Sequence, residues 1–348
     1  MPEDDCDYKV VSHSRRFPDG AKKNNPMNAP CLGIDIAQLS FVAALWFAPD
    51  RVLKKEFPNH GGGFRQLGRW LKTHGVGALR AAVESTNIYA EALAQWLHEA
   101  GHRVYLLNPE RVSHYARSLG QCNKTDPADA VTIALFIARH EATPWTPLAP
   151  EQKTLRSLTR VRHQLVEQRV QLTNQLRTVE AAARPYLQAV LDMVRAQLLA
   201  LAREITRHLR AHPALSTQVR RLMTMKGVGL TTAAVTIAEL PPITAQSDPR
   251  TICGWAGLVP RRRQSGRIEL PARLSRKGNV YLRRALYMPA LVAKRHNPLL
   301  RAFALRLAQN GKTNGAILGA VAHKMLRILV GLLRSNTDFD PNWSHQKI

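Results

Sequence analysis

The chain has 348 residues, 45% of them hydrophobic, and its 50 Lys and Arg against 25 Asp and Glu give a formal net charge of +25. This length suffices for two or three domains with hydrophobic cores, and the excess of positive charge predicts a polyanionic partner, most simply the phosphate backbone of a nucleic acid. A membrane partner is not supported, because the most apolar late stretch, 316–333, contains His323, Lys324 and Arg327 and is typical of an amphipathic helix.

The cysteines and the first residues indicate the compartment. Cys6, Cys31, Cys122 and Cys253 show no CxxC spacing, so neither a zinc site nor a disulfide framework is indicated. Residues 1–28 are polar and have no hydrophobic core typical of a signal peptide. We therefore expect reduced thiols, a disordered basic tail over residues 1–28, and a cytosolic protein.

Apolar runs and turn residues predict an α/β domain after this tail. The first two strands, separated by Gln38–Ser40, predict a hairpin, and a third, exposed strand follows. Gly61–Gly63 is expected to break the chain, and Thr125 or Asp126 to cap a late helix. The predicted strands are 31–37, 41–48, 52–59, 79–84 and 102–109, and the predicted helices are 64–74, 89–101 and 128–140.

Four acids stand out from this basic chain. Asp35 and Glu84 each close an apolar run, and Asp126 and Asp129 lie three apart at a helix start, where both carboxylates can share one face. Carboxylates at the ends of buried elements suit a divalent metal, because Mg²⁺ combines a few oxygen ligands with phosphate oxygens. The order of elements resembles the ribonuclease H-like arrangement, whose catalytic carboxylates lie at these places.

The middle of the chain predicts two long helices. No Gly or Pro occurs in residues 151–183, so one helix of about 50 Å is expected there, ended before Pro185. A second apolar series follows over residues 187–209. The first helix carries a seven-residue apolar repeat, at Leu158, Leu165, Leu172 and Val179. Two interpretations stay open, a helical hairpin within one chain and a coiled-coil dimerisation arm.

Residues 222–240 predict a helix, a glycine turn and a second helix. Gly227 and Gly229 would expose backbone N–H groups at a helix N-terminus, where phosphate binds readily. Thr231 and Thr232 would cap that helix. The pattern resembles the helix–hairpin–helix motif of DNA-binding proteins, and a plain helix–helix connection is the alternative.

The strongest local signal for phosphate contact follows. Between Arg250 and Arg334 there are eighteen Lys or Arg and a single acid, Glu269. Ser265 lies in this region beside Gly266, where arginines could stabilise the charge of a phosphoryl transfer. No His–Asp pair is next to this serine, so the residues alone favour a polar loop residue, and Ser275 would compete as nucleophile.

Six motifs occur along the chain in this order: GIDIA, VEST-x-x-Y, NKTDPADA, KGVG, WAGLVPRRRQSG and RLSRKGNVYLRRALY. Together they resemble the IS110-family transposases of the DEDD type, over about Leu32 to Leu333. One departure is visible, since Asn87 follows Thr86 where the family commonly has Gly. Asn tolerates left-handed backbone better than most residues, so this departure puts little in doubt.

The resemblance implies a RuvC-like domain whose four acids hold Mg²⁺ or Mn²⁺, and a transposase domain with Ser265 as its nucleophile. It also implies a structured guide RNA from the element, which pairs with donor and target DNA. Members act as homo-oligomers, a dimer or a tetramer, in which the carboxylates of one subunit meet the serine of another. The corresponding acids here are Asp35, Glu84, Asp126 and Asp129.

We therefore expect a multi-domain α/β plus α protein of the bacterial cytosol. The expected parts are a tail (1–28), a RuvC-like or ribonuclease H-like domain (29–148), a helical hairpin or coiled coil (149–215), a mainly helical transposase domain (216–335) and a second tail (336–348). The residues expected to contact nucleic acid are Lys226, Gly227, Gly229, Arg261, Arg262, Arg263, Arg267, Arg276 and Lys277.

The expected function is an RNA-guided transposase or recombinase that cuts and rejoins DNA strands through a serine. The nearest alternative is a RuvC-like structure-specific endonuclease that hydrolyses DNA without a covalent intermediate. A third interpretation is a basic, non-enzymatic nucleic-acid-binding protein, in which the four acids would be structural despite the cost of clustering carboxylates in a core without a cation.

Overall fold

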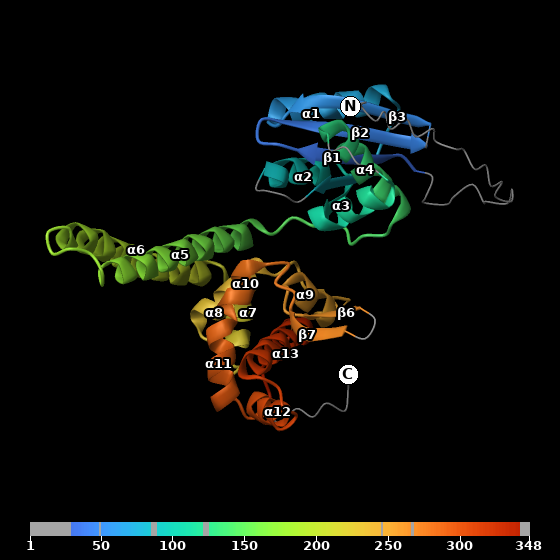
Figure 1. The fold of residues 1–348 in the computed structure, drawn as a ribbon. Coiled ribbons are helices and arrows are strands. Elements are labelled where there is room, and N and C mark those ends of the chain that lie inside the picture. Colours follow the sequence, from blue (N-terminus) through green and yellow to red (C-terminus); the bar gives the residue numbers. More distant parts are fainter. Residues whose placement is uncertain are drawn as a thin grey trace, which may run out of the picture. The chain divides into compact units, whose positions relative to one another are not determined.

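The computed structural model describes residues 29–48, 50–84, 89–120, 125–244, 246–265 and 268–341. The chain divides into two compact units, Met1–Pro147 and Leu148–Ile348, each with its own core (Figure 1). The tail expected over residues 1–28 lies outside the described residues, as do residues 342–348 of the second tail.

A five-stranded mixed sheet organises the first unit, in the order β3-β2-β1-β4-β5. β1 pairs antiparallel with β2, β2 pairs antiparallel with β3, and β4 and β5 run parallel to β1. The strands are β1 (Cys31–Ile36), β2 (Ser40–Ala48), β3 (Arg51–Pro58), β4 (Arg80–Glu84) and β5 (Arg103–Leu107). The predicted hairpin, the exposed third strand and the two later strands are confirmed, because alternating or continuous apolar runs dictate them.

Helices cover both faces of this sheet. On one face α1 (Gly61–Thr73) and α2 (Tyr89–Glu99) pack against a core that includes Leu32 and Ile34. On the other face α4 (Asp126–Arg139) packs against Trp46, Ala82 and neighbouring side chains, with α3 (Pro109–Ser118) beside it. The first unit is therefore a layered α/β domain, as the ribonuclease H-like resemblance implies.

Two local predictions in this unit are wrong. Gly61–Gly63 does not break the chain but forms the first turn of α1, because the His60 ring accepts a hydrogen bond from the Gly62 N–H at 3.1 Å and caps the helix. Pro109 does not merely stop β5. It occupies the first turn of α3, which the sequence did not reveal, and the Asn108 side chain caps that helix.

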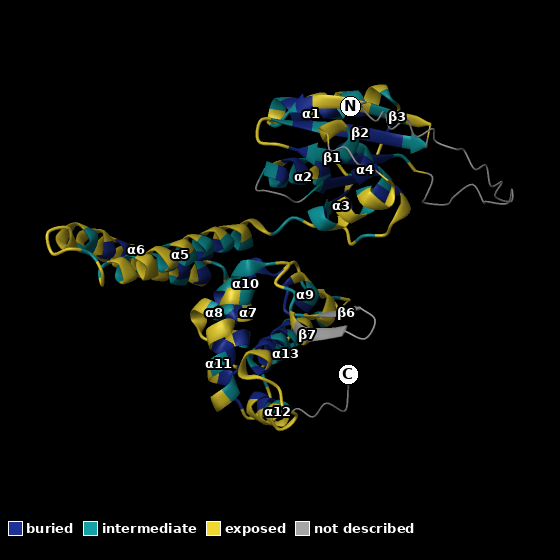
Figure 2. Ribbon diagram, viewed as in Figure 1, coloured by how far each residue is buried: buried dark blue, intermediate teal, exposed yellow. Residues whose placement is uncertain are grey.

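The second unit begins with two long helices that pack along each other, α5 (Pro150–Gln175) and α6 (Arg184–Ala211) (Figure 1). The expected helix through residue 183 is too long by eight residues, because the chain uses turns over residues 176–183 to reverse direction before α6 starts. Most side chains of this pair are half-buried or exposed, including those of the seven-residue repeat (Figure 2). The pair contributes little to the core of the unit beyond its base.

The remainder of the second unit surrounds α13 (Asn314–Ser335), which has nine buried residues. Among the described helices α13 is the one long and apolar enough to cross a membrane by length and composition, and half of its apolar window is buried inside the unit. It is therefore a core helix. The other elements are α7 (Pro213–Met223), α8 (Leu230–Glu239), α9 (Pro249–Trp255), β6 (Pro260–Ser265), β7 (Ile268–Leu274), α10 (Val280–Ala285), α11 (Tyr287–His296) and α12 (Pro298–Gln309).

Candidate active site

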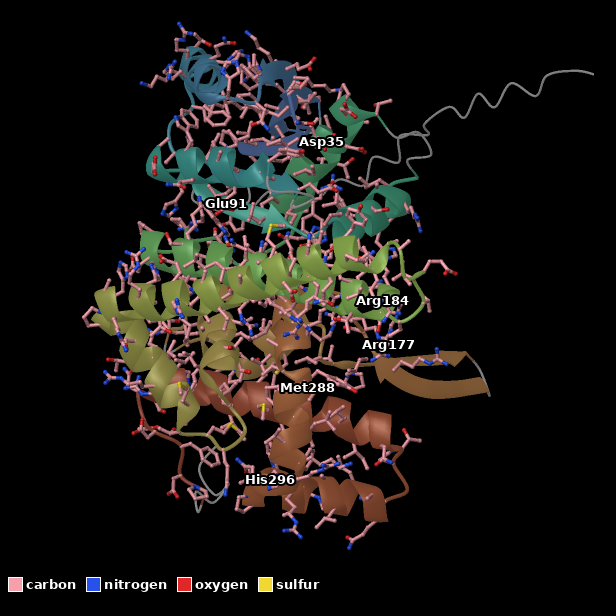
Figure 3. The ribbon with its side chains drawn as sticks, turned by 90° about the vertical axis from the view of Figure 1, so that its left-hand side faces the viewer. Asp35, Glu91, Arg177, Arg184, Met288 and His296 are labelled. Atoms are coloured by element: carbon pink, nitrogen blue, oxygen red, sulfur yellow. The ribbon has the colours of Figure 1, made fainter. Side chains whose placement is uncertain are left out.

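Two of the four predicted acids line one cavity in the first unit. Asp35 lies near the end of β1, and Asp126 lies in the first turn of α4. Both border a cavity of about 170 Å³, together with residues of the β1–β2 hairpin. Figure 3 labels Asp35 at this end of the sheet. Acidic side chains in the first turn of a helix interact favourably with the helix dipole, and Asp126 occupies such a position at the rim of the cavity.

The packing of α4 on β1 explains why these two acids meet. A Cβ at Gly33 would lie 2.2 Å from the Ala130 oxygen and 2.3 Å from the Ala134 nitrogen, so only glycine lets the helix approach this strand so closely. Asp126, Ala130 and Ala134 recur every four residues and share one helix face. Gly33 and Asp35 alternate by two and share one sheet face. Contact at Gly33 and Ala130 therefore places Asp35 toward Asp126.

Glu84 and Asp129 lie close to this pair in the fold, without lining the cavity. The parallel register pairs Ile34 with Val83, so the next residues along these strands, Asp35 and Glu84, lie on neighbouring strands and the same sheet face. Asp129 follows Asp126 by one turn of α4. Among the described residues, no group of three or more Asp, Glu, His or Cys is gathered closely enough to hold a metal ion.

Ser265 is the last residue of β6, where its backbone pairs with Ile268 at the start of β7. The expectation of a loop residue in a helical region is thus corrected, because a two-stranded antiparallel hairpin carries it. Gly266 and Arg267, which follow Ser265 in the sequence, lie outside the described residues. Arg261, Arg262 and Arg263 belong to the same strand, four to two residues before Ser265.

The base of this hairpin is fixed to a loop that contains the predicted phosphate-binding residues Arg276 and Lys277. The Ser275 N–H donates to the Val259 oxygen at 2.9 Å, and the Arg276 N–H donates to the Gly257 oxygen at 3.2 Å. Gly278 has a φ of +132°, and a Cβ there would lie 1.9 Å from the Trp255 oxygen. That position therefore admits only glycine, which lets the loop backbone pack directly against the Trp255 backbone.

Cations crowd this loop. Burial, and then the charges of Arg276 and Arg284, lower the pKa of the Arg283 guanidinium. The Arg283 guanidinium also donates a hydrogen bond to the Ala256 backbone oxygen at 3.1 Å, and this bond fixes its position beside the loop. Because these positive charges lie close together and repel one another, a bound anion such as phosphate would lower the electrostatic energy of this loop.

The glycine turn lies between α7 and α8, as predicted. Gly227 has a φ of +105°, and Gly229 is the N-cap residue of α8. The expectation that Thr231 and Thr232 cap the helix is wrong, since both lie inside its first turn and no side-chain cap is present. Open backbone N–H groups at this N-terminus suit an anion, and Lys226 precedes the turn.

Sequence reasoning missed a buried acid, Glu239, at the end of α8. Its side chain is almost fully buried and accepts hydrogen bonds from Arg160 at 2.7 and 2.8 Å and from Asn279 Nδ2 at 2.7 Å. Asn279 also caps α10 and ends the loop that contains Arg276. Glu239 thereby connects α5, α8 and that loop. An acid in the otherwise uncharged sequence of α8 was the one signal for this residue.

Comparisons with known proteins match both halves of this arrangement. Residues 32–181, which include the four acids, match a family model for transposases of the DEDD, IS110 type. Residues 219–305, which include Ser265 and the glycine turn, match the model of the transposase IS116/IS110/IS902 family.

Individual relatives span most of the chain. The pilin gene-inverting proteins of Moraxella bovis and Moraxella lacunata are each 28% identical over 90% of this chain and 98% of their own length. The transposase for insertion sequence element IS1328 of Yersinia enterocolitica is 29% identical over 69% of this chain and 79% of its own length.

Proposed function

Since the chain belongs to the IS116/IS110/IS902 family of transposases and is therefore a DNA transposase or recombinase, we propose that it exchanges DNA strands through a serine nucleophile assisted by a divalent metal. The carboxylates would act from the first unit and Ser265 from the second. The single observation that carries this proposal is the cavity that Asp35 and Asp126 share. It lies in a domain that resembles the ribonuclease H-like arrangement, for which catalytic acids are expected at these positions.

The donor set fits Mg²⁺ or Mn²⁺. Mg²⁺ is usually held by one or two carboxylates with water and substrate phosphate, so Asp35 and Asp126 suffice as its protein ligands. Glu84 and Asp129 would complete the family's set from the neighbouring strand and the next helical turn. A bound metal of this kind stabilises the charge on the attacking and leaving oxygens of a phosphodiester.

The serine would form and then release a covalent link to DNA. Ser265 Oγ attacks the phosphorus, loses its proton and forms a phosphoserine diester, while the displaced DNA oxygen takes up a proton and leaves as a hydroxyl. A DNA hydroxyl then attacks the same phosphorus and restores the serine. One phosphodiester is broken and one is made, so no external energy source is needed. Gene inversion, for which two of the relatives are named, requires such rejoining, and hydrolysis alone does not supply it.

The nucleic-acid contacts are part of the same proposal. Arg276 and Lys277 would hold the DNA backbone at the base of the hairpin, the end of β6 opposite Ser265, since their loop is fixed there. The turn at Lys226, Gly227 and Gly229 would bind backbone phosphate in the helix–hairpin–helix manner. Arg261, Arg262, Arg263 and Arg267 flank the serine in the sequence.

The guide RNA, the homo-oligomer, the cytosolic location and the five-part domain division rest on the family resemblance and the composition, and we retain them as proposals. The packed pair α5 and α6 is compatible with an arm that contacts a second subunit, and equally with a hairpin that packs only on itself. Sequencing the RNA that copurifies with the full chain tests the guide directly, because a guide predicts one recurrent RNA species from the element.

The deciding experiment traps the covalent intermediate. The full chain is incubated with Mg²⁺ and DNA carrying the element with its flanks, nicked so that rejoining is blocked, and the adduct is digested and mapped by mass spectrometry. We expect DNA on Ser265, no adduct with Ser265→Ala, and a normal adduct with Ser275→Ala. Cleavage that continues in Ser265→Ala but stops in Asp126→Asn would instead identify a hydrolytic RuvC-like endonuclease.

A further inference from the structure

The end of the second unit formed by α11, α12 and α13 has positive charge without acids. From Tyr287 to Ser335 there are eight Lys or Arg and no Asp or Glu. Elsewhere in this unit arginines pair with carboxylates, as Arg195 does with Asp192 and Arg207 with Glu204. Within the part of the chain that the structure describes, no salt bridge includes a cation of these three helices.

Lys324 of α13 lies at the centre of this charge. Its Nζ lies 4.6 Å from the centre of the Phe303 ring, and the guanidinium carbon of Arg306 lies 5.6 Å from the same centre. Burial, and then the charges of Arg306 and Arg327, lower the pKa of the Lys324 ammonium. A half-buried ammonium beside like charges is unfavourable in the free protein, and an anion would relieve that repulsion.

A cavity of about 290 Å³ lies at the corner between α11 and α12. Arg295, His296 and Arg301 supply its polar lining, and Leu305, whose surface is 55% exposed, supplies part of its apolar lining. Figure 3 labels His296 where α11 ends. Cations around a small apolar floor match the alternation of phosphate and sugar along a nucleic-acid strand.

This corner is continuous with the glycine turn. The Asn297 side chain donates a hydrogen bond to the Lys226 backbone oxygen at 3.4 Å. Gly227 packs closely against α11, since a Cβ added at this glycine would lie 3.2 Å from the Ala293 nitrogen. A backbone bound at the turn between α7 and α8 would therefore pass directly onto the end of α11.

We propose that the α12 surface, defined as Arg295, His296, Arg301, Leu305, Arg306, Lys324 and Arg327, binds the phosphodiester backbone of a nucleic acid. α12 has 12 residues and is about 18 Å long, and it carries Arg301 and Arg306. Arg295 of α11 lines the same cavity as Arg301, and Lys324 of α13 shares the Phe303 ring with Arg306, so the combined charge exceeds what one small anion can neutralise. A membrane surface would need a broad apolar face, and on α12 Leu305 is the one exposed large hydrophobic side chain. None of these residues lines the carboxylate cavity or belongs to the β6–β7 hairpin.

Equilibrium binding tests this surface without any catalytic step. The full chain is titrated in EDTA with random-sequence duplex DNA and with RNA of the same length over a range of salt concentrations. Arg301→Ala/Arg306→Ala is expected to weaken binding about tenfold or more near physiological salt and to lower the salt slope by about two. The matched control is Arg195→Ala/Arg207→Ala, which removes the same charge from arginines that carboxylates already neutralise and should change neither quantity.

Comparing DNA with RNA shows which nucleic acid this surface binds. A loss confined to DNA assigns the surface to donor or target, and a loss confined to RNA assigns it to an RNA partner. Unchanged affinity and slope for both would overturn the proposal. The proposal would also be overturned if the Arg301→Ala/Arg306→Ala variant lost binding to vesicles of phosphatidylcholine and phosphatidylserine while its nucleic-acid binding stayed unchanged.

Lys324→Met separates binding from a structural role. Methionine keeps the apolar contact with Phe303 and removes the crowded charge, so we expect a higher midpoint of thermal unfolding together with weaker nucleic-acid binding. If Lys324 served only to stabilise the fold, its replacement would lower the midpoint of thermal unfolding. A lower midpoint, or a higher midpoint with unchanged affinity, therefore contradicts the proposal.

Discussion

Glu239 in the second unit and Asp126 in the first are both helical acids in a strongly basic chain, and their surroundings differ. Glu239 is 3% exposed and accepts hydrogen bonds from Arg160 and Asn279. Asp126 is exposed and lines a cavity with Asp35. A buried, neutralised carboxylate holds elements together, whereas carboxylates that face an open cavity are accessible to a cation from solution. Acids of equal charge therefore have different roles in the two units.

The largest expected effect comes from neutralising the cavity. Asp35→Asn or Asp126→Asn keeps the side-chain shape and removes a metal ligand, so strand cleavage should fall on the order of a thousandfold, as expected for several kcal/mol of lost transition-state stabilisation. Thermal unfolding should change little. Asp50→Asn, in the exposed turn before β3, is the control and should cleave normally. If both cavity variants cleaved DNA as fast as the wild type, Asp35 and Asp126 would not be catalytic metal ligands, and their contrast with the structural acid Glu239 would be lost.

Glu239→Ala tests the other half of the comparison. It leaves Arg160 and Asn279 without their shared acceptor, so the free energy of unfolding should fall by about 3–5 kcal/mol. Glu204→Ala breaks an exposed pair with Arg207 and should cost less than about 1 kcal/mol. Chemical denaturation of both variants measures the difference, and equal losses would show that Glu239 is not a structural centre.

Gly33→Ala should separate the two cavity acids without altering either. The added Cβ would lie 2.2 Å from the Ala130 oxygen, so α4 must move away from β1 at a cost of about 1–3 kcal/mol. We expect reduced stability together with weaker divalent-metal binding. Gly77→Ala in the same unit meets no atom within 4 Å and should change neither. Wild-type metal affinity in Gly33→Ala would contradict the proposed geometry.

The smallest effect at neutral pH concerns Cys253. Burial raises the pKa of this thiol to about 12, so in the folded protein it stays protonated at pH 8 and should resist iodoacetamide until urea unfolds the chain. Because the folded pKa lies above the ordinary value near 9, the associated stability is complete below pH 9 and is lost as the pH rises toward 12. Rapid alkylation of the folded protein at pH 8, followed by mass spectrometry, would contradict this.

Much of the first unit could be predicted from the sequence, because its strands are continuous or alternating apolar runs bounded by turns. The helix α3 was missed, since Pro109 both ends a strand and starts a helix. The end of α5 was misplaced because no Gly or Pro marks it, and only the reversal into α6 requires it. The hairpin β6–β7 was missed because its strands are rich in arginine and lack a clear apolar alternation.

The candidate site, too, could be predicted from the sequence only in part. The acids could be chosen from the sequence because Asp35 and Glu84 each close an apolar run and the other two lie at a helix start. The structure brings Asp35 and Asp126 to one cavity. The close approach at Gly33 that aligns them depends on α4, about a hundred residues later, and no local pattern shows it. Glu239 was missed because its partners lie 79 and 40 residues away along the chain.

The most direct test of the account is Mn²⁺ binding to the full chain without nucleic acid, measured by electron paramagnetic resonance. We expect the wild type to bind Mn²⁺ and Asp126→Asn and Asp35→Asn each to lose this binding. Asp50→Asn and Glu239→Gln should retain it. Equal Mn²⁺ binding by the wild type and both cavity variants would contradict the claim that Asp35 and Asp126 form a metal centre.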